Sequence, residues 1–107
     1  MNIVTVLHNK AMEFADEALL ARMEGNNQAS TALFEKAFDL EKEAAIAIGE
    51  DQQESESRYI LIRSAAALAL NCGKYHEVKA LITLGLSGNP PVFIVEELKA
   101  LEEKLQG

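Results

Sequence analysis

The side chains best suited to catalysis or metal binding are few in this sequence and lie far apart. The two histidines, His8 and His76, are separated by most of the chain. His76 is next to Glu77, but adjacent residues of a helix point in different directions and do not form a pair. Both histidines are therefore interpreted as surface residues, and no catalytic residue is predicted.

Cys72 is the single cysteine of the 107 residues, so an internal disulfide is impossible. No metal-ligand spacing surrounds it, and no glycine-rich phosphate loop occurs in the chain. At the end of a helix, the negative end of the helix dipole raises the pKa of a thiol, which predicts an inert side chain. The sequence predicts neither a metal site nor a cofactor. A single reduced cysteine also fits a cytoplasmic protein.

Carboxylates are abundant, and the net charge is −7. Residues 39–57 form an acidic run that contains one base, Lys42, and this run is interpreted as a solvated helix face. Phosphate groups attract the opposite charge, so nucleic acid and anionic membranes are not expected partners. The acids near the C-terminus are likewise interpreted as the polar side of an amphipathic helix. The acids of the run are Asp39, Glu41, Glu43, Glu50, Asp51, Glu54 and Glu56.

The composition favours one all-α domain that is not embedded in a membrane. Apolar residues make up 49% of the chain, which supplies a core, and 25% are charged. Alanine, leucine, glutamate and lysine dominate, and all are strong helix formers. The longest apolar runs, such as 65–70, are too short to span a bilayer. The first ten residues lack the features of a signal peptide, which again predicts a cytoplasmic protein.

Four glycines divide the chain into helices, because glycine readily takes the left-handed conformation that ends a helix. Asp51 with Glu54 has the layout of a capping box, and Asn89 before two prolines marks another helix start. The β-branched residues 3–6 would suit a strand, but no partner strand is predicted. The glycines are Gly25, Gly49, Gly73 and Gly88, and the predicted helices span about 2–24, 27–48, 51–72, 75–87 and 91–106.

Two parts of the chain repeat each other at an offset of 48 residues (73 − 25). With Gly25 placed on Gly73, small and apolar residues coincide. Two stretches carry the repeat, "GNNQASTALFEKAFDL" and "NCGKYHEVKALITLGLSGNP". Small residues on both copies would let paired helices approach closely, and Tyr75 is expected to plug the second turn. These small residues are Ala18, Ala37, Ala66 and Gly85.

The two stretches resemble the tetratricopeptide repeat, whose unit is a helical hairpin turned at a glycine and followed by proline. The resemblance implies a right-handed stack in residues 1–107. Its first hairpin would span about 2–48, its second about 51–87, and a capping helix about 91–106. In the last helix, Ile94, Leu98, Leu101 and Leu105 would face the stack. The offset of 48 exceeds the usual repeat of about 34 residues. An unrelated four- or five-helix bundle with alanine seams is the alternative.

In that family the first helix of each hairpin lines a concave groove that binds a partner segment. The resemblance therefore implies a non-catalytic protein–protein interaction module with an apolar groove containing Arg22 and Arg63. The arginines could instead pair with acids such as Glu54 or Glu56. Other functions left open are a homo-oligomerising structural protein, including a homodimer, and an enzyme on a helical bundle. The expected contacts to an unidentified protein or peptide are Met12, Leu19, Arg22, Met23, Arg63, Ala67 and Asn71.

Overall fold

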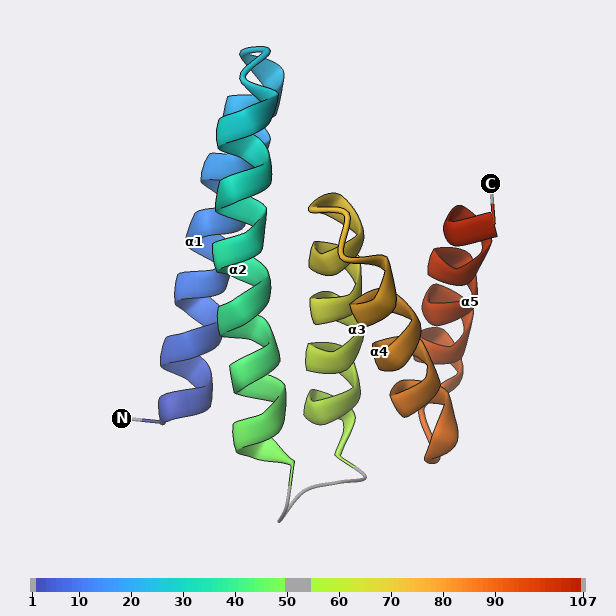
Figure 1. The fold of residues 1–107 in the computed structure, drawn as a ribbon. Helices are drawn as coiled ribbons and strands as arrows, with labels where there is room; N and C mark the ends of the chain where they lie inside the picture. Colours follow the sequence, from blue (N-terminus) through green and yellow to red (C-terminus); the bar gives the residue numbers. More distant parts are fainter. Residues whose placement is uncertain (1, 50–54, 107) are drawn as a thin grey trace.

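The computed structural model describes residues 2–49 and 55–106, and within them every regular element is an α-helix (Figure 1). The all-α prediction is confirmed. The third helix begins later than predicted, where the Ser55 side chain accepts a hydrogen bond from the backbone N–H of Arg58 at 3.2 Å. The predicted capping box of Asp51 and Glu54 lies outside the described residues. The helices are α1 (Ile3–Met23), α2 (Asn27–Ile48), α3 (Glu56–Asn71), α4 (Tyr75–Ser87) and α5 (Val92–Gln106).

The helices run alternately up and down in a row, with α2 in front of α1 and α4 in front of α3 (Figure 1). The Cα atoms span 39 × 39 × 20 Å, and the short dimension corresponds to two layers of packed helices. Polar side chains also link helices that are two apart along the chain. These links are Arg22–Asn71 between α1 and α3, Lys42–Glu77 between α2 and α4, and Arg63–Glu97 between α3 and α5.

The turn after α1 and the turn after α3 have the same backbone geometry. Gly25 has φ 81° and Gly73 has φ 77°, the left-handed conformation that costs glycine little. The hydrogen bonds around the two glycines also match at an offset of 48 residues. They run from the Asn26 N–H to the Ala21 carbonyl at 2.8 Å, and from the Lys74 N–H to the Ala69 carbonyl at 2.9 Å.

Three predictions about the turns are wrong. Gly49 has φ −64° and Gly88 has φ −96°, so neither takes the left-handed conformation. Tyr75 does not plug a turn, because its side chain is 57% exposed. The tyrosine that orders a connection is Tyr59, which is fully buried in α3. Its hydroxyl oxygen accepts a hydrogen bond from the Asn89 N–H at 2.7 Å and so holds the α4–α5 connection against α3.

The small residues of the repeat lie at close helix contacts, as predicted. Ala18, Ala37 and Ala66 have no exposed surface, and Gly85 is buried. A Cβ atom added at Gly85 would come 2.7 Å from Cδ1 of Leu98, so α4 and α5 approach too closely there for any larger residue without a shift. Small side chains therefore set the spacing of the helices in both halves of the chain.

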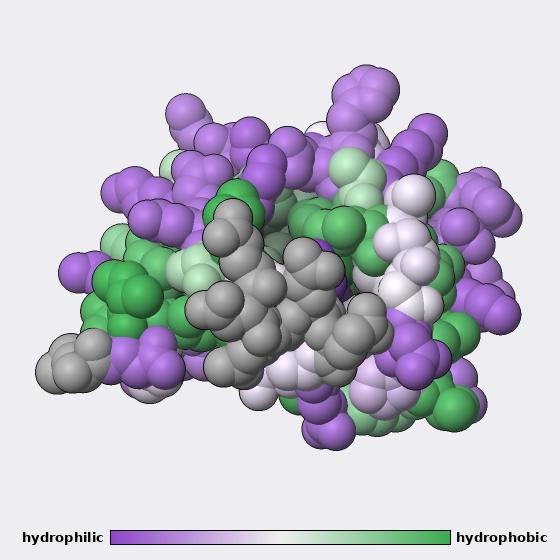
Figure 2. All heavy atoms as spheres, turned by 90° about the horizontal axis from the view of Figure 1, so that it is seen from below, coloured by the Kyte–Doolittle hydropathy of each residue, from purple (hydrophilic) through white to green (hydrophobic). Residues whose placement is uncertain are grey.

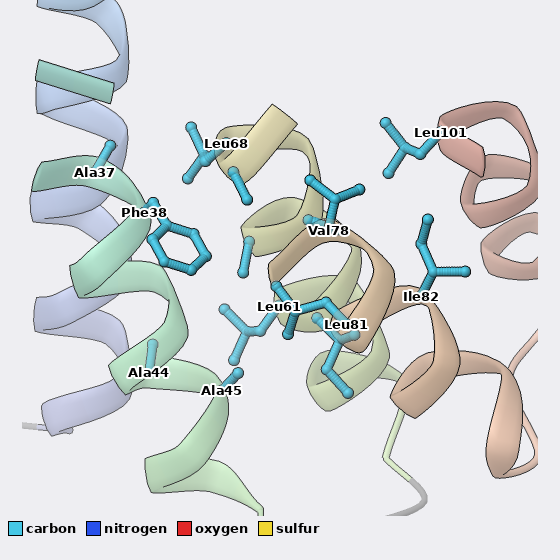
Figure 3. Packing of buried hydrophobic residues seen from close by; sticks show 14 of the residues in the cluster. Ala37, Phe38, Ala44, Ala45, Leu61, Leu68, Val78, Leu81, Ile82 and Leu101 are labelled. Carbon is cyan, nitrogen blue, oxygen red and sulfur yellow. The ribbon is translucent and has the colours of Figure 1, made fainter. Parts of the chain in front are cut away.

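The core runs through the whole row of helices. Phe38 of α2 points toward α3, and Val78 and Leu81 of α4 cover the other side of α3 (Figure 3). The stripe predicted for the last helix is confirmed, with its exposed polar side formed by glutamates and lysines. Ile94, Leu98 and Leu101 are buried, and Leu105 is partly buried.

Among the described residues, no helix combines the length and the apolar character needed to cross a membrane.

Candidate partner-binding face

The residues expected to bind a partner lie on α1 and α3, whose C-terminal ends are linked by the hydrogen bond between Arg22 and Asn71. Met23 is 82% exposed and Leu19 is 46% exposed, although both are apolar. Arg22 is exposed between them. We call this surface the α1–α3 face; its members are Met12, Leu19, Arg22 and Met23 of α1, and Arg63, Ala67 and Asn71 of α3.

Arg22 joins the C-terminal ends of the two helices. Its Nη2 donates a hydrogen bond to Oδ1 of Asn71 at 2.9 Å, and the Asn71 side chain donates to the Ala67 carbonyl at 2.9 Å. The guanidinium carbon lies 4.8 Å from the centre of the Phe34 ring, within the range of a cation–π contact. The guanidinium is thus positioned by Asn71 and Phe34, and Arg22 remains exposed.

Arg63 has a different environment. It is partly buried, and its Nη1 donates to Oε2 of Glu97 on α5. The internal partner of Arg63 is therefore Glu97 and not Glu56, one of the acids expected from the sequence; the other, Glu54, lies outside the described residues. Sequence spacing could not reveal this pair, because it depends on α5 folding back beside α3.

The two arginines are not arranged to hold one carboxylate together. Arg63 precedes Asn71, the partner of Arg22, by eight residues of α3, which is about 12 Å at the helical rise. Arg22 of α1 is hydrogen-bonded to Asn71 at the C-terminal end of α3, whereas Arg63 of α3 is paired with Glu97 of α5. A segment bound along the face would meet the two guanidiniums one after the other.

A contact between His8 of α1 and the buried Glu41 of α2 was missed in the sequence. Glu41 was assigned to a solvated acidic face, but its side chain has no exposed surface. Both of its carboxylate oxygens lie 2.9 Å from Nδ1 of His8, whose side chain is 37% exposed. The assignment of Glu41 is therefore wrong, and His8 is a partner of a buried group rather than a free surface residue.

The spacing of α2 contains the signal that locates Glu41. It follows Ala37 by four residues and precedes Ala44 and Ala45 by three and four, and all three alanines are buried. A residue in that register faces the core whatever its charge. His8 also lines a depression of about 220 Å³ between α1 and the start of α3, next to Thr5 and Ser57.

Cys72 lies at the C-terminal end of α3 and is partly buried. Burial raises the pKa of its thiol above the ordinary value, and the nearby Lys74 offsets part of that rise. The direction agrees with the sequence prediction, but desolvation rather than the charge of the helix end is the main cause. Its Sγ also lies 3.5 Å from the Ala69 carbonyl.

Within residues 2–49 and 55–106, no three His, Cys, Asp or Glu side chains gather in a way that could hold a metal ion. Comparisons of the chain with models of protein families, with curated proteins and with solved structures found no match.

Proposed function

We propose that the protein is a non-catalytic interaction module that binds a segment of a partner protein along the α1–α3 face. In this proposal the helices form a right-handed stack similar to tetratricopeptide repeats. The hairpins α1–α2 and α3–α4 are its two units, α5 is its end, and the α1–α3 face is its groove.

Three observations support the stacked arrangement. The two hairpins turn at glycines with the same conformation, and the hydrogen bonds of the two turns coincide at the repeat offset. The small residues at equivalent positions of the two hairpins, Ala18 and Ala66, and Ala37 and Gly85, are all buried. Side chains link α1 to α3, α3 to α5, and α2 to α4, as expected of neighbouring helices in two layers.

The exposure of Leu19 and Met23 beside Arg22 is the observation that carries the binding proposal. A single exposed leucine is ordinary, but here two large apolar side chains flank a guanidinium that is already oriented by Asn71 and Phe34. Methionine adapts to partners of different shape, and an ordered arginine offers forked donors at a reduced entropic cost. This combination suits an extended segment that carries both an apolar and an acidic residue.

The test uses short peptides selected from a display library against the full chain. Binding of a selected peptide is then measured by calorimetry for Leu19→Asp and for Leu20→Asp. Leu20 is 59% exposed on another side of α1, so it is a matched control. We expect Leu19→Asp to weaken binding at least about tenfold, which corresponds to about 1.4 kcal/mol, and Leu20→Asp to leave it unchanged. Equal effects of the two variants would refute the assignment of the face.

Arg63→Ala distinguishes the two roles of that arginine. If Arg63 donates to the bound segment, the affinity should fall by about 1.5–3 kcal/mol, the range for hydrogen bonds to charged groups. If binding does not change and the circular dichroism spectrum is that of a folded protein, Arg63 serves only to pair with Glu97.

A further inference from the structure

A hollow with a mixed apolar and polar lining lies between α4 and α5 and reaches Leu70 of α3. It consists of two adjoining depressions of about 390 and 470 Å³ that share Lys79 of α4 and Leu105 of α5. Each has the size of a small-ligand pocket, about 300–1,000 Å³. Side chains of Leu70, Ile82 and Leu105 form its apolar part. We call it the α4–α5 hollow.

The rim of the α4–α5 hollow is basic in a chain whose net charge is −7. Lys79 and Lys104 both line it, and among the described residues neither lysine makes an ion pair. Glu102 lies at the other depression, next to Thr83. An apolar part beside two unpaired lysines is complementary to a helix that carries a leucine and two carboxylates on one side.

α1 presents such a side. Glu13, Glu17 and Leu20 are exposed and follow one another at spacings of four and three, so they share one side of the helix. This outer α1 stripe points away from the α1–α3 face; Lys10 flanks it. Ile3 and Val6 are also exposed where α1 begins. Apolar side chains reach the surface in several places on the face seen in Figure 2. The outer side of α1 therefore mixes apolar and charged residues, whereas a fully polar outer side is what keeps the ends of repeat stacks from associating.

We propose that the outer α1 stripe of one molecule docks into the α4–α5 hollow of a second copy. Leu20 would enter the apolar part, while Glu13 and Glu17 would face Lys79 and Lys104. The stripe from Glu13 to Leu20 is about 10 Å long, and the α4 side of the hollow from Tyr75 to Thr83 is about 12 Å long. Since the stripe lies on α1 and the hollow is lined by α3, α4 and α5, the two surfaces differ, so the contact is head-to-tail and leaves one stripe and one hollow free to add further copies.

The experiment is light scattering of the full chain from about 1 μM to about 1 mM, the range in which weak contacts titrate. We expect the average mass to rise with concentration beyond that of a dimer, and to fall when salt screens the charged contact. A mass that stays at one chain, or that stops at two, would overturn the proposal.

Neighbouring leucines of α1 provide the matched variants. Leu20→Glu should abolish the rise in mass, whereas Leu19→Glu, on the α1–α3 face, should leave it unchanged. Loss of association in both variants, or in neither, would contradict the contact. The outcome for self-association is independent of that for peptide binding, since self-association depends on Leu20 and peptide binding depends on Leu19.

A charge exchange tests the orientation. Lys79→Glu/Lys104→Glu and Glu13→Lys/Glu17→Lys each place like charges across the contact, so each protein alone should associate at least about tenfold more weakly. An equal mixture of the two restores opposite charges at every contact, and its mass should rise again. A mixture that stays as monomeric as its components would overturn the proposed pairing even if the wild-type protein associates.

Discussion

Removing the imidazole of His8 should destabilise the protein far more than the partial exposure of this residue suggests. Glu41 has no exposed surface, and its two oxygens share the single donor Nδ1 of His8 at 2.9 Å. In His8→Ala the carboxylate remains inside the α1–α2 contact without that donor. An unsatisfied buried group costs about 1–3 kcal/mol, and breaking a fully buried ion pair costs about 3–5 kcal/mol.

The partial exposure of His8 places the expected loss between these two ranges. Water can enter the space that the imidazole leaves, so we expect a loss of about 2–3 kcal/mol in the free energy of unfolding. Domains of this size have a total stability of about 5–15 kcal/mol. Each kcal/mol shifts the melting temperature by about 4–8 °C, so the Tm of His8→Ala should fall by roughly 10 °C or more.

Urea unfolding followed by circular dichroism measures the loss, and two further variants identify its cause. Asp39→Ala removes an exposed acid of the same helix and should change stability by no more than about 0.5 kcal/mol. The double variant His8→Leu/Glu41→Met removes both polar groups and should recover most of the stability, because apolar replacements of a buried pair are often neutral or stabilising. If His8→Ala behaves like Asp39→Ala, or if the double variant is less stable than His8→Ala, the carboxylate is not the cause.

Four other predictions concern packing, backbone and reactivity. Ala66→Leu should overpack a fully buried contact by about 1–3 kcal/mol, while Ala100→Leu on the exposed side of α5 should be nearly silent; equal urea midpoints would contradict the seam. Gly73→Ala should cost about 1–2 kcal/mol in the same assay, since a Cβ meets no atom within 4 Å there and the positive φ is the sole source of strain. Because burial raises the pKa of Cys72, its alkylation by iodoacetamide should accelerate at a higher pH than that of an exposed thiol; a rate already maximal near pH 8 would contradict this. Deleting the chain from Pro91 onward should cause aggregation or loss of helical circular dichroism, because α5 covers the apolar side of α3 and α4; a soluble monomer that unfolds cooperatively would show that the first four helices suffice.

The parts of the fold that were predictable depend on local chemistry. Gly25 and Gly73 follow helix-forming runs, and the small residues that repeat on both sides of them predict close packing of the paired helices. Gly49 and Gly88 looked the same in sequence and behave differently. Gly88 precedes Asn89 and two prolines. The backbone N–H of Asn89 donates a hydrogen bond to the hydroxyl of Tyr59, which lies 30 positions earlier in the chain. A glycine next to a long-range contact cannot be assigned a conformation from its neighbours alone.

The candidate site was less predictable because its side chains are paired across helices. The register that buries Glu41 can be read from the alanines around it, but its partner His8 comes from another helix, 33 residues earlier in the chain. Arg63 and Glu97 are 34 residues apart, and Arg22 and Asn71 are 49 apart. Helical periodicity shows which residues share a side of one helix, and it contains no information about which helix lies opposite.

In the proposed function, these pairings would determine where a partner segment gains binding energy. Arg22 and Arg63 each already have a hydrogen-bond acceptor in the folded protein. A partner carboxylate that displaced Glu97 from Arg63 would exchange one charged contact for another, with little net gain and with Glu97 left nearby as a like charge. At Arg22 the acceptor is the neutral amide oxygen of Asn71. A partner carboxylate would form a stronger hydrogen bond with Arg22, since hydrogen bonds between two charged groups are stronger than those with a neutral acceptor. The exposed apolar side chains Leu19 and Met23 lie within one helical turn of Arg22 on α1. Binding energy on the α1–α3 face should therefore concentrate at the C-terminal end of α1, where burial of Leu19 and Met23 and a charge-assisted bond to Arg22 can occur together.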